Sequence, residues 1–305
     1  MNKDIGKDPE EYIVPLNMNG LQGRMLYLPS KKNKEILLVY GQHSTIERWL
    51  GLAEELSKFG NVAMPDLPGF GGMQSFYKLL EKPTLDRFAA YLASFIKLRY
   101  KRRRLTIVGI GFGFVVATKM LQSYPDLAKK VDLVVSVGGI AHRNDLKISR
   151  GRRRKGLLLG KVFGLYATAK IFHLLFMRRR LLRHVYAAKP RVYKKYLELS
   201  GAVISPSDSQ AVNLWRLCDL RTHIYTLGEL LNLDNCDSRV PIMAWHVHVP
   251  GNKLIDKHSV EQHMRVIYDD FHESDSKLKN NSKLASYKDA SKLIDHKLRR
   301  LLAKA

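Results

Sequence analysis

The first half of the chain alternates short, mostly apolar runs with stretches in which apolar residues recur every three or four positions. A run of four to eight apolar residues predicts a buried strand, and the longer periodic stretches predict amphipathic helices. The expected strands are 36–40, 61–64, 105–109 and 131–137. The expected helices are 46–59, 84–97 and 112–124. Thr84 precedes the second helical pattern and is expected to cap that helix.

Strands that are apolar almost throughout and that alternate with helices predict a parallel sheet covered on both faces. Residues 11–16 and 24–28 are expected to add antiparallel edge strands, whereas residues 147–237 indicate several helices and no strand. The strand pattern resumes over 240–249. A helix over 259–267, a weak strand near Phe271 and a basic helix over 290–302 are expected to follow. We therefore expect a core formed by residues 1–145 and 238–305, with a helical insertion over 146–237.

The insertion carries much of the positive charge. The net charge of the chain is +24, and sixteen Lys or Arg but no Asp or Glu lie between Leu146 and Leu197. Such a field attracts nucleic acid, acidic lipid headgroups or small anionic ligands, although a solvated helix face would have the same composition. No motif that reads nucleic acid accompanies the basic runs, and aromatic residues do not interleave with them. Nucleic acid is therefore not the expected partner.

Within the insertion, residues 156–176 are rich in apolar side chains and are flanked by basic clusters. A helix that spans a bilayer needs about 20 largely apolar residues, and Lys161, Lys170 and His173 interrupt this stretch. A helix lying over a pocket, with its Lys and Arg reaching water, fits the pattern. A helix lying in the interface of an anionic membrane fits it as well, and the two interpretations are compatible.

Composition sets the remaining bounds. A chain of 305 residues with 45% hydrophobic residues can bury a full core. The charged N-terminal segment lacks an apolar run, so we expect no signal peptide and a cytoplasmic location, with association at the membrane surface left open. Cys218 and Cys236 lie far apart without partners at metal-ligand spacing, so neither a disulfide nor a metal site is expected. No cofactor is expected, and the sequence leaves the oligomeric state undetermined.

Three short motifs occur in order along the predicted sheet. Gly109-Ile110-Gly111-Phe112-Gly113, between a strand and a helix, matches the nucleophile elbow G-x-S-x-G except at its middle residue. Tyr40-Gly41-Gln42-His43 ends an earlier strand, and Asp66-Leu67-Pro68-Gly69-Phe70-Gly71 follows the next one. Together with the helical insertion, these motifs resemble the α/β-hydrolase fold, with its oxyanion-hole loop, its D-x-P-G-x-G loop and its cap. The resemblance implies a mostly parallel central sheet, helices on both faces and a helical cap.

The resemblance also implies a Ser-Asp-His triad, and its three positions carry other residues here. The nucleophile position is Gly111, the position of the acid corresponds best to Asn252, and counting back from the C-terminal helix suggests Lys279 for the histidine. Acyl transfer by this route needs a hydroxyl that attacks, a base that takes its proton and an acid that orients the base. The triad is thus expected to be degraded, although glycine could also be present because it relaxes the turn.

Other residues could supply replacement chemistry. Ser44 follows His43 in the oxyanion-type loop, but its position where a helix begins favours an N-cap. His246 and His248 alternate on one face of a strand, which suits core histidines better than a metal pair.

Three further candidates follow strands or lie in them. Asp145 follows the strand at the position where some hydrolases of this fold place an alternative acid. Asp256 lies one helical turn after Asn252. His272 is the only histidine in the region where the triad histidine is expected, and it lies in or at the end of the expected last strand. Asp66 is expected to be a structural carboxylate.

The backbone N–H groups of Phe112 and Gln42 are expected to face one another at the start of a helix and to form an anion site without any serine. A ligand pocket is expected around Gly41, Gln42, His43 and Phe112. We therefore expect a protein that binds a small anionic or lipid-like ligand, or a partner, without serine-hydrolase turnover. The alternatives are an esterase-like or lipase-like hydrolase with an unusual or weak site, and a membrane-surface binder that acts through the basic cap.

Overall fold

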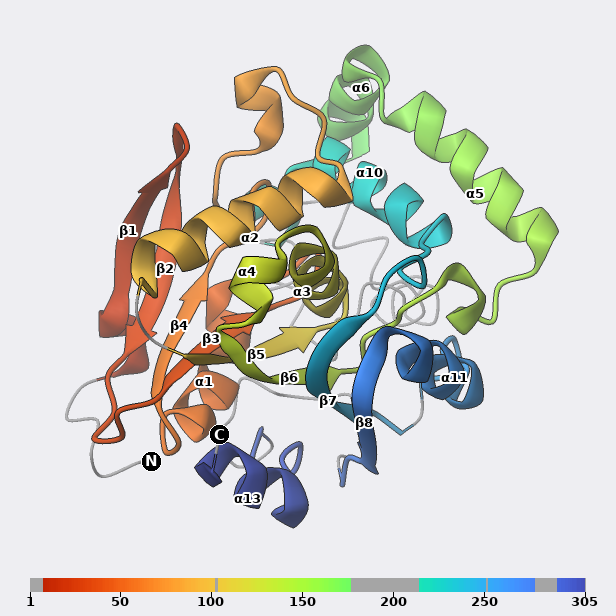
Figure 1. Cartoon of the computed structure of the whole chain (residues 1–305). Coiled ribbons are helices and arrows are strands. Elements are labelled where there is room, and N and C mark those ends of the chain that lie inside the picture. Colours follow the sequence, from red (N-terminus) through yellow and green to blue (C-terminus); the bar gives the residue numbers. More distant parts are fainter. Residues whose placement is uncertain (1–7, 102–103, 177–213, 251, 278–289, 305) are drawn as a thin grey trace.

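The computed structural model describes residues 8–101, 104–176, 214–250, 252–277 and 290–304. One sheet of eight strands runs through the molecule in the order β1-β2-β4-β3-β5-β6-β7-β8 (Figure 1). The strands are β1 (Ile13–Met18), β2 (Leu21–Leu28), β3 (Glu35–Val39), β4 (Asn61–Pro65), β5 (Leu105–Ile110), β6 (Val131–Val137), β7 (Val240–His248) and β8 (Tyr268–Asp275).

The sheet is parallel from β4 to β8, and β1 and β2 extend it as an antiparallel edge. The central strands β3, β4 and β5 are buried at every position, because helices cover both faces of the sheet. The predicted mostly parallel sheet and its antiparallel edge strands are therefore confirmed.

Helices cover both faces of this sheet. The helices of the described chain are α1 (Leu50–Leu56), α2 (Leu85–Arg99), α3 (Phe112–Ser123), α4 (Pro125–Ala128), α5 (Arg150–Phe163), α6 (Tyr166–Phe176), α10 (Leu220–Leu231), α11 (Lys257–Ile267) and α13 (His296–Lys304). Short 3-10 turns are η1 (Pro9–Tyr12), η2 (Ile46–Trp49), η3 (Phe76–Leu79) and η4 (Arg143–Asp145). Figure 1 shows α2, α3 and α4 together on one face, with α1 and α13 on the other. An ion pair of 2.6 Å between Arg299 Nη1 and Glu55 Oε1 joins α13 to α1.

Helices α5, α6 and α10 follow β6 and precede β7, and we call them the cap helices. They lie at one end of the molecule, away from α1 and α13 (Figure 1). Among the described residues, no helix combines the length and the apolar character that crossing a membrane requires.

The sequence signals for helix ends predicted some of the observed caps and boundaries and missed others. Thr84 Oγ1 accepts a hydrogen bond from Arg87 N, so the predicted cap of α2 is confirmed. The N-cap predicted for Ser44 is wrong, because Thr45 precedes η2 and the Ser44 hydroxyl accepts the indole N–H of Trp49 at 2.8 Å. The pattern over 46–59 forms η2 followed by α1, and the last helix begins at His296 rather than at residue 290.

Candidate functional site

The turn between β5 and α3 has the geometry of a nucleophile elbow. Gly111 adopts φ 51° and ψ −116°, a backbone conformation that residues with a side chain rarely adopt. A Cβ atom at Gly109 would overlap the backbone of Phe114, and one at Gly113 would come within 2.6 Å of the Tyr40 carbonyl oxygen. The small residues on both sides of Gly111 therefore let the start of α3 pack against the end of β3.

Two backbone donors adjoin these two segments: the Phe112 N–H begins α3, and the Gln42 N–H follows β3. Neither the Phe112 N–H nor the Gln42 N–H donates to another described residue. The side chain of Gln42 is buried, and its Oε1 accepts a hydrogen bond of 2.8 Å from Thr226 Oγ1 on α10. Its Nε2 has no hydrogen-bond partner in the described part of the chain. Backbone donors at a helix N-terminus are well suited to bind an anion.

Aromatic rings close the space next to this loop. His43 has φ 51°, and the centroid of its ring lies 4.2 Å from that of Trp215 and 4.9 Å from that of His223. Burial lowers the pKa of His223 to about 3. Burial, together with the neighbouring His223 and Arg48, holds the pKa of His43 well below its usual range. Both imidazoles are therefore neutral near pH 7.

A cavity of about 470 Å³ is lined by residues of α5 and α10, and Trp215 and His223 also line it. Its lining is formed by Leu146, Ile148, Arg152, Gly156, Leu159, Gly160, Phe163, Trp215, Leu220, His223, Ile224, Leu227, Gly228, Leu230 and Leu231. Among the described residues, the lining is thus aliphatic and aromatic, and Arg152 is the one that carries a charge at neutral pH. The predicted pocket residues Gly41, Gln42, His43 and Phe112 do not line this cavity, so their role stays a prediction.

Glycines make room for the cavity. A Cβ atom at Gly156 of α5 would lie 3.1 Å from Leu231 Cδ1, so this glycine lets α5 and α10 approach closely. A Cβ atom at Gly160 would make an ordinary contact at 4.0 Å, and one at Gly228 would meet nothing within 4 Å. Side chains at Gly160 and Gly228 would therefore grow into the cavity.

We compared the chain with known proteins. No family model matches it, and no curated protein matches it by sequence. Solved structures do match. An N-acyl homoserine lactonase complexed with N-hexanoyl homoserine is 15% identical with TM-score 0.64, and the match covers 96% of each chain. An epoxide hydrolase from Bacillus megaterium is 12% identical with TM-score 0.64, covering 96% of this chain and 100% of the other.

A membrane phospholipase A described as a bacterial virulence factor also matches, with 14% identity and TM-score 0.64, over 96% of this chain and 87% of that one. These matches agree with the mostly parallel eight-stranded sheet of this chain. The chain has the α/β-hydrolase fold. In this α/β-hydrolase fold, the residue at the elbow is Gly111, which has no side chain to attack a substrate.

Of the other two predicted triad positions, one lies in the described part of the chain, and the assignment of both stays a prediction. Lys279 lies outside the described residues. Asn252 Oδ1 accepts a hydrogen bond of 3.1 Å from Leu254 N and so shapes its own loop.

The weaker candidates among the predicted residues have structural contacts. Asp256 caps α11, and the backbone N–H groups of Ser259 and His258 together with Lys147 hold its pKa below the usual value. His272, in β8, pairs with Asp270 at 2.9 Å and stacks on Trp245.

The two histidines of β7 differ in burial. His246 is buried and its Nδ1 lies 2.9 Å from Ser136 Oγ, and burial lowers its pKa to about 3. His248 is half-buried, and burial also lowers its pKa.

Asp66, which follows β4, contacts Arg24 of β2 and Tyr40, the residue after β3. Its Oδ1 accepts a hydrogen bond of 2.5 Å from Tyr40 Oη, and its Oδ2 lies 3.2 Å from Arg24 Nε. Burial raises the pKa of Asp66 to about 7, against the opposing effect of these two donors. These contacts fasten the 66–71 loop to β2 and β3, as a structural carboxylate would.

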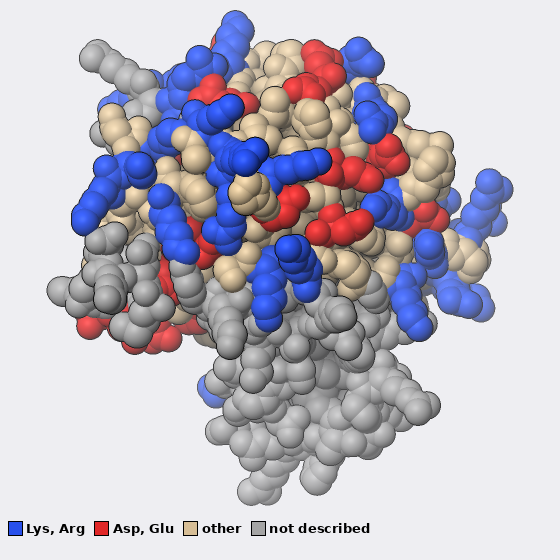
Figure 2. Space-filling model, turned by 90° about the horizontal axis from the view of Figure 1, so that it is seen from below, with Lys and Arg blue, Asp and Glu red and all other residues tan. Residues whose placement is uncertain are grey.

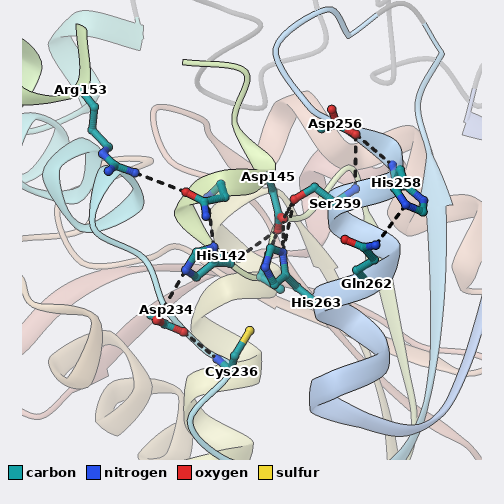
Figure 3. A network of polar contacts seen from close by, with 12 residues as sticks. His142, Asp145, Arg153, Asp234, Cys236, Asp256, His258, Ser259, Gln262 and His263 are labelled. Carbon is teal, nitrogen blue, oxygen red and sulfur yellow. Dashed lines mark hydrogen bonds and ion pairs between the residues drawn. The ribbon is translucent and has the colours of Figure 1, made fainter. Parts of the chain in front are cut away.

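Asp145 is the centre of a polar network (Figure 3). The carboxylate is fully buried, and its Oδ2 accepts the backbone N–H groups of Ala141 and His142 at 2.8 and 2.9 Å. Its Oδ1 lies 2.5 Å from His263 Nδ1 and 2.8 Å from Ser259 Oγ, both on α11. The sequence had suggested Asp145 as an alternative acid, but it gave no sign of His263, which is 118 positions away.

The network contains Ser, His and Asp but does not have the arrangement of a triad. In a triad the acid and the nucleophile contact opposite nitrogens of the imidazole. Here Ser259 Oγ lies 3.4 Å from His263 Nδ1, the nitrogen that also contacts Asp145. The Asp145 backbone further accepts from Asp256 N at 2.8 Å. The cluster therefore fastens the segment that enters the cap to α11.

Proposed function

We propose that the protein binds a lipid-like ligand, with an apolar chain and an anionic group, in the cavity of the cap, without serine-hydrolase turnover. The observation that carries the proposal is the composition of the cavity. Among the described residues, aliphatic and aromatic side chains surround about 470 Å³, and Arg152 is the charged residue in this lining. Cavities of some 300–1,000 Å³ with few polar groups are the usual sites of small ligands.

The chemistry of the cavity favours a chain with a charged end. Each methylene that moves from water into the cavity gains about 0.8 kcal/mol. The guanidinium of Arg152 can form charge-assisted hydrogen bonds with a carboxylate or a phosphate. The neutral His223 can contribute a hydrogen bond without adding charge. A medium-chain or long-chain fatty acid combines the required features.

The elbow supports the second half of the proposal. With Gly111 at the turn, no hydroxyl can form an acyl-enzyme there. An oxyanion-type site without a nucleophile can retain about 10³-fold catalysis over water, so weak residual turnover is the competing possibility. The structures of similar fold include a lactonase, an epoxide hydrolase and a phospholipase, which supports the idea that ester-like or lipid-like ligands suit this scaffold.

Titration with cis-parinaric acid, a fluorescent C18 carboxylate, tests the proposal. We expect saturable binding by the wild-type chain and at least tenfold weaker binding by Gly228→Leu, whose side chain would fill the cavity. Gly151→Leu is the matched control, because Gly151 is also helical and open but does not line the cavity. Arg152→Gln should weaken binding about fivefold, as expected for one half-solvated charge pair, whereas Arg150→Gln should not.

Two results would count against the proposal. Equal binding by Gly228→Leu and the wild type would place the ligand elsewhere. Robust turnover of short-chain or long-chain p-nitrophenyl esters by the wild-type chain would favour the hydrolase instead. Circular dichroism of every variant shows whether the cap helices still form, so loss of folding is distinguished from loss of binding.

A further inference from the structure

Large apolar side chains are exposed along the outer side of α5 and α6. Leu158 is 65% exposed, Tyr166 62% and Leu174 64%. The other exposed members on these two helices and the turn between them are Leu159, Val162, Leu165 and Ile171. Scattered single apolar residues are ordinary on a surface, but a contiguous group marks a contact surface. We call this group, together with the basic residues described next, the outer cap face.

Basic side chains share this face. Arg154, Lys155 and Lys161 of α5 are exposed and form no ion pair with a described residue, and α5 has no acidic residue. The face of the molecule in Figure 2 differs, because there Lys and Arg are interspersed with Asp and Glu. The unneutralised charge of α5 therefore sets up a positive field next to apolar side chains.

Helical periodicity explains how one helix serves two purposes. With 3.6 residues per turn, Arg154, Leu158, Lys161 and Val162 fall on one side of α5. Residues Gly156, Gly160 and Phe163 fall on the opposite side, where they line the cavity. The outer cap face is thus distinct from the ligand cavity, except that Leu159 lies at the boundary and borders both.

A second segment supplies an apolar tip at the same end of the molecule. Leu80 follows η3, has φ 59° and is 96% exposed. Arg221 of α10 lies over the ring of Tyr77 in η3 at 3.7 Å and over that of Tyr166 in α6 at 5.5 Å. Figure 1 shows the orange loop that contains η3 at the same end as α6. A side chain that is held in a left-handed turn and points into water is well placed to insert into an apolar phase.

We propose that the outer cap face and Leu80 dock on the surface of an anionic lipid bilayer. Exposed aliphatic side chains between Lys and Arg are what an interfacial helix needs, because the side chains enter the acyl boundary while the cations bind acidic headgroups. Nucleic acid fits less well, since bases stack on aromatic rings, and Tyr166 is the one aromatic side chain among the exposed apolar residues described on this face. The surface does not depend on the ligand proposed for the cavity.

Vesicle flotation tests the proposal with the full-length chain. The wild type should float with phosphatidylcholine vesicles that contain phosphatidylglycerol and should remain unbound with phosphatidylcholine alone. Neutralising Arg154, Lys155 and Lys161 to Gln together should reduce the partition coefficient by at least tenfold, since each charge near such a surface contributes about fivefold. The matched control neutralises Lys297, Arg300 and Lys304 of α13 to Gln, which removes the same charge from another face.

The apolar part has its own test. Leu80→Ser combined with Leu158→Ser should reduce binding to anionic vesicles severalfold and should leave cis-parinaric acid binding unchanged, because neither residue lines the cavity. Equal binding of the wild type to both kinds of vesicle, or binding to neither, would overturn the proposal. So would an equal loss in the α13 variant, or an RNA affinity that depends on the three α5 residues while vesicle binding does not.

Discussion

The elbow allows a quantitative prediction, because Gly111 both adopts the unusual backbone angles of the turn and lacks the hydroxyl that a nucleophile needs. Gly111→Ser introduces the residue type that G-x-S-x-G would have, at φ 51° and ψ −116°. Holding a non-glycine residue in such a region costs about 1–3 kcal/mol. Serine also reduces the conformational freedom of the unfolded chain, which stabilises the folded state by about 0.4–1 kcal/mol. Taking the middle of each range, the free energy of unfolding should therefore fall by about 1.3 kcal/mol.

The assay is urea denaturation followed by circular dichroism, with Gly228→Ser as the matched substitution. Gly228 is in the middle of α10 with ordinary helical backbone, and a Cβ atom there meets nothing within 4 Å. Serine is the better helix former, so Gly228→Ser should raise the free energy of unfolding by about 0.5 kcal/mol. If Gly111→Ser proves as stable as the wild type while Gly228→Ser behaves as expected, the reasoning about strain at the elbow is wrong.

The same variant should not become an esterase. A hydroxyl at residue 111 still needs a base to take its proton, and the described residues place His263 and Asp145 in a network with Ser259 rather than at the elbow. Turnover of p-nitrophenyl esters by Gly111→Ser at more than about tenfold over the wild type would mean that an unrecognised base faces the turn.

Three further predictions concern stability. Asp145→Asn should lower the free energy of unfolding by about 2 kcal/mol in urea denaturation, because an amide cannot accept from all four donors of the carboxylate; an unchanged midpoint would refute this. Burial raises the pKa of Asp66 from 3.8 to about 7, so the native state binds the proton more tightly. The stabilisation that comes from this tighter proton binding is therefore present in full below pH 3.8 and is lost as the pH rises through about 7. Asp66→Asn should flatten that part of the stability profile relative to the wild type, and an unchanged slope would count against the assignment. Gly228→Ala should raise the free energy of unfolding by about 1 kcal/mol, the difference between Gly and Ala inside a helix, and a loss of stability would show that the site is not open.

The sheet and the elbow could be predicted because their signals are local. Strands such as β5 are apolar at every position, and the glycines around Gly111 are spaced as the sharp turn requires. Ser44 is a case in which the local sequence misleads. A serine at the start of a helical pattern predicts a cap, but the Ser44 hydroxyl accepts a hydrogen bond from the indole N–H of Trp49 instead. Which donor the Ser44 hydroxyl accepts from depends on where the Trp49 ring packs, and this is known only from the folded structure.

The polar network and the cavity could not be predicted, since both depend on contacts between distant segments. Asp145 and His263 meet only because the segment after β6 packs against α11. The cavity arises where α5 crosses α10, and Gly160 and Gly228 leave space there that no spacing along the chain indicates. The sequence did place a pocket under the cap, but it expected the oxyanion-type loop to line that pocket.

The most direct test of the account is the intact mass of the wild-type chain after incubation with an alkyl fluorophosphonate, which labels activated nucleophiles covalently. The account predicts an unchanged mass in a sample that still binds cis-parinaric acid. One adduct per chain on any side chain at the elbow or in the cap cavity would contradict it.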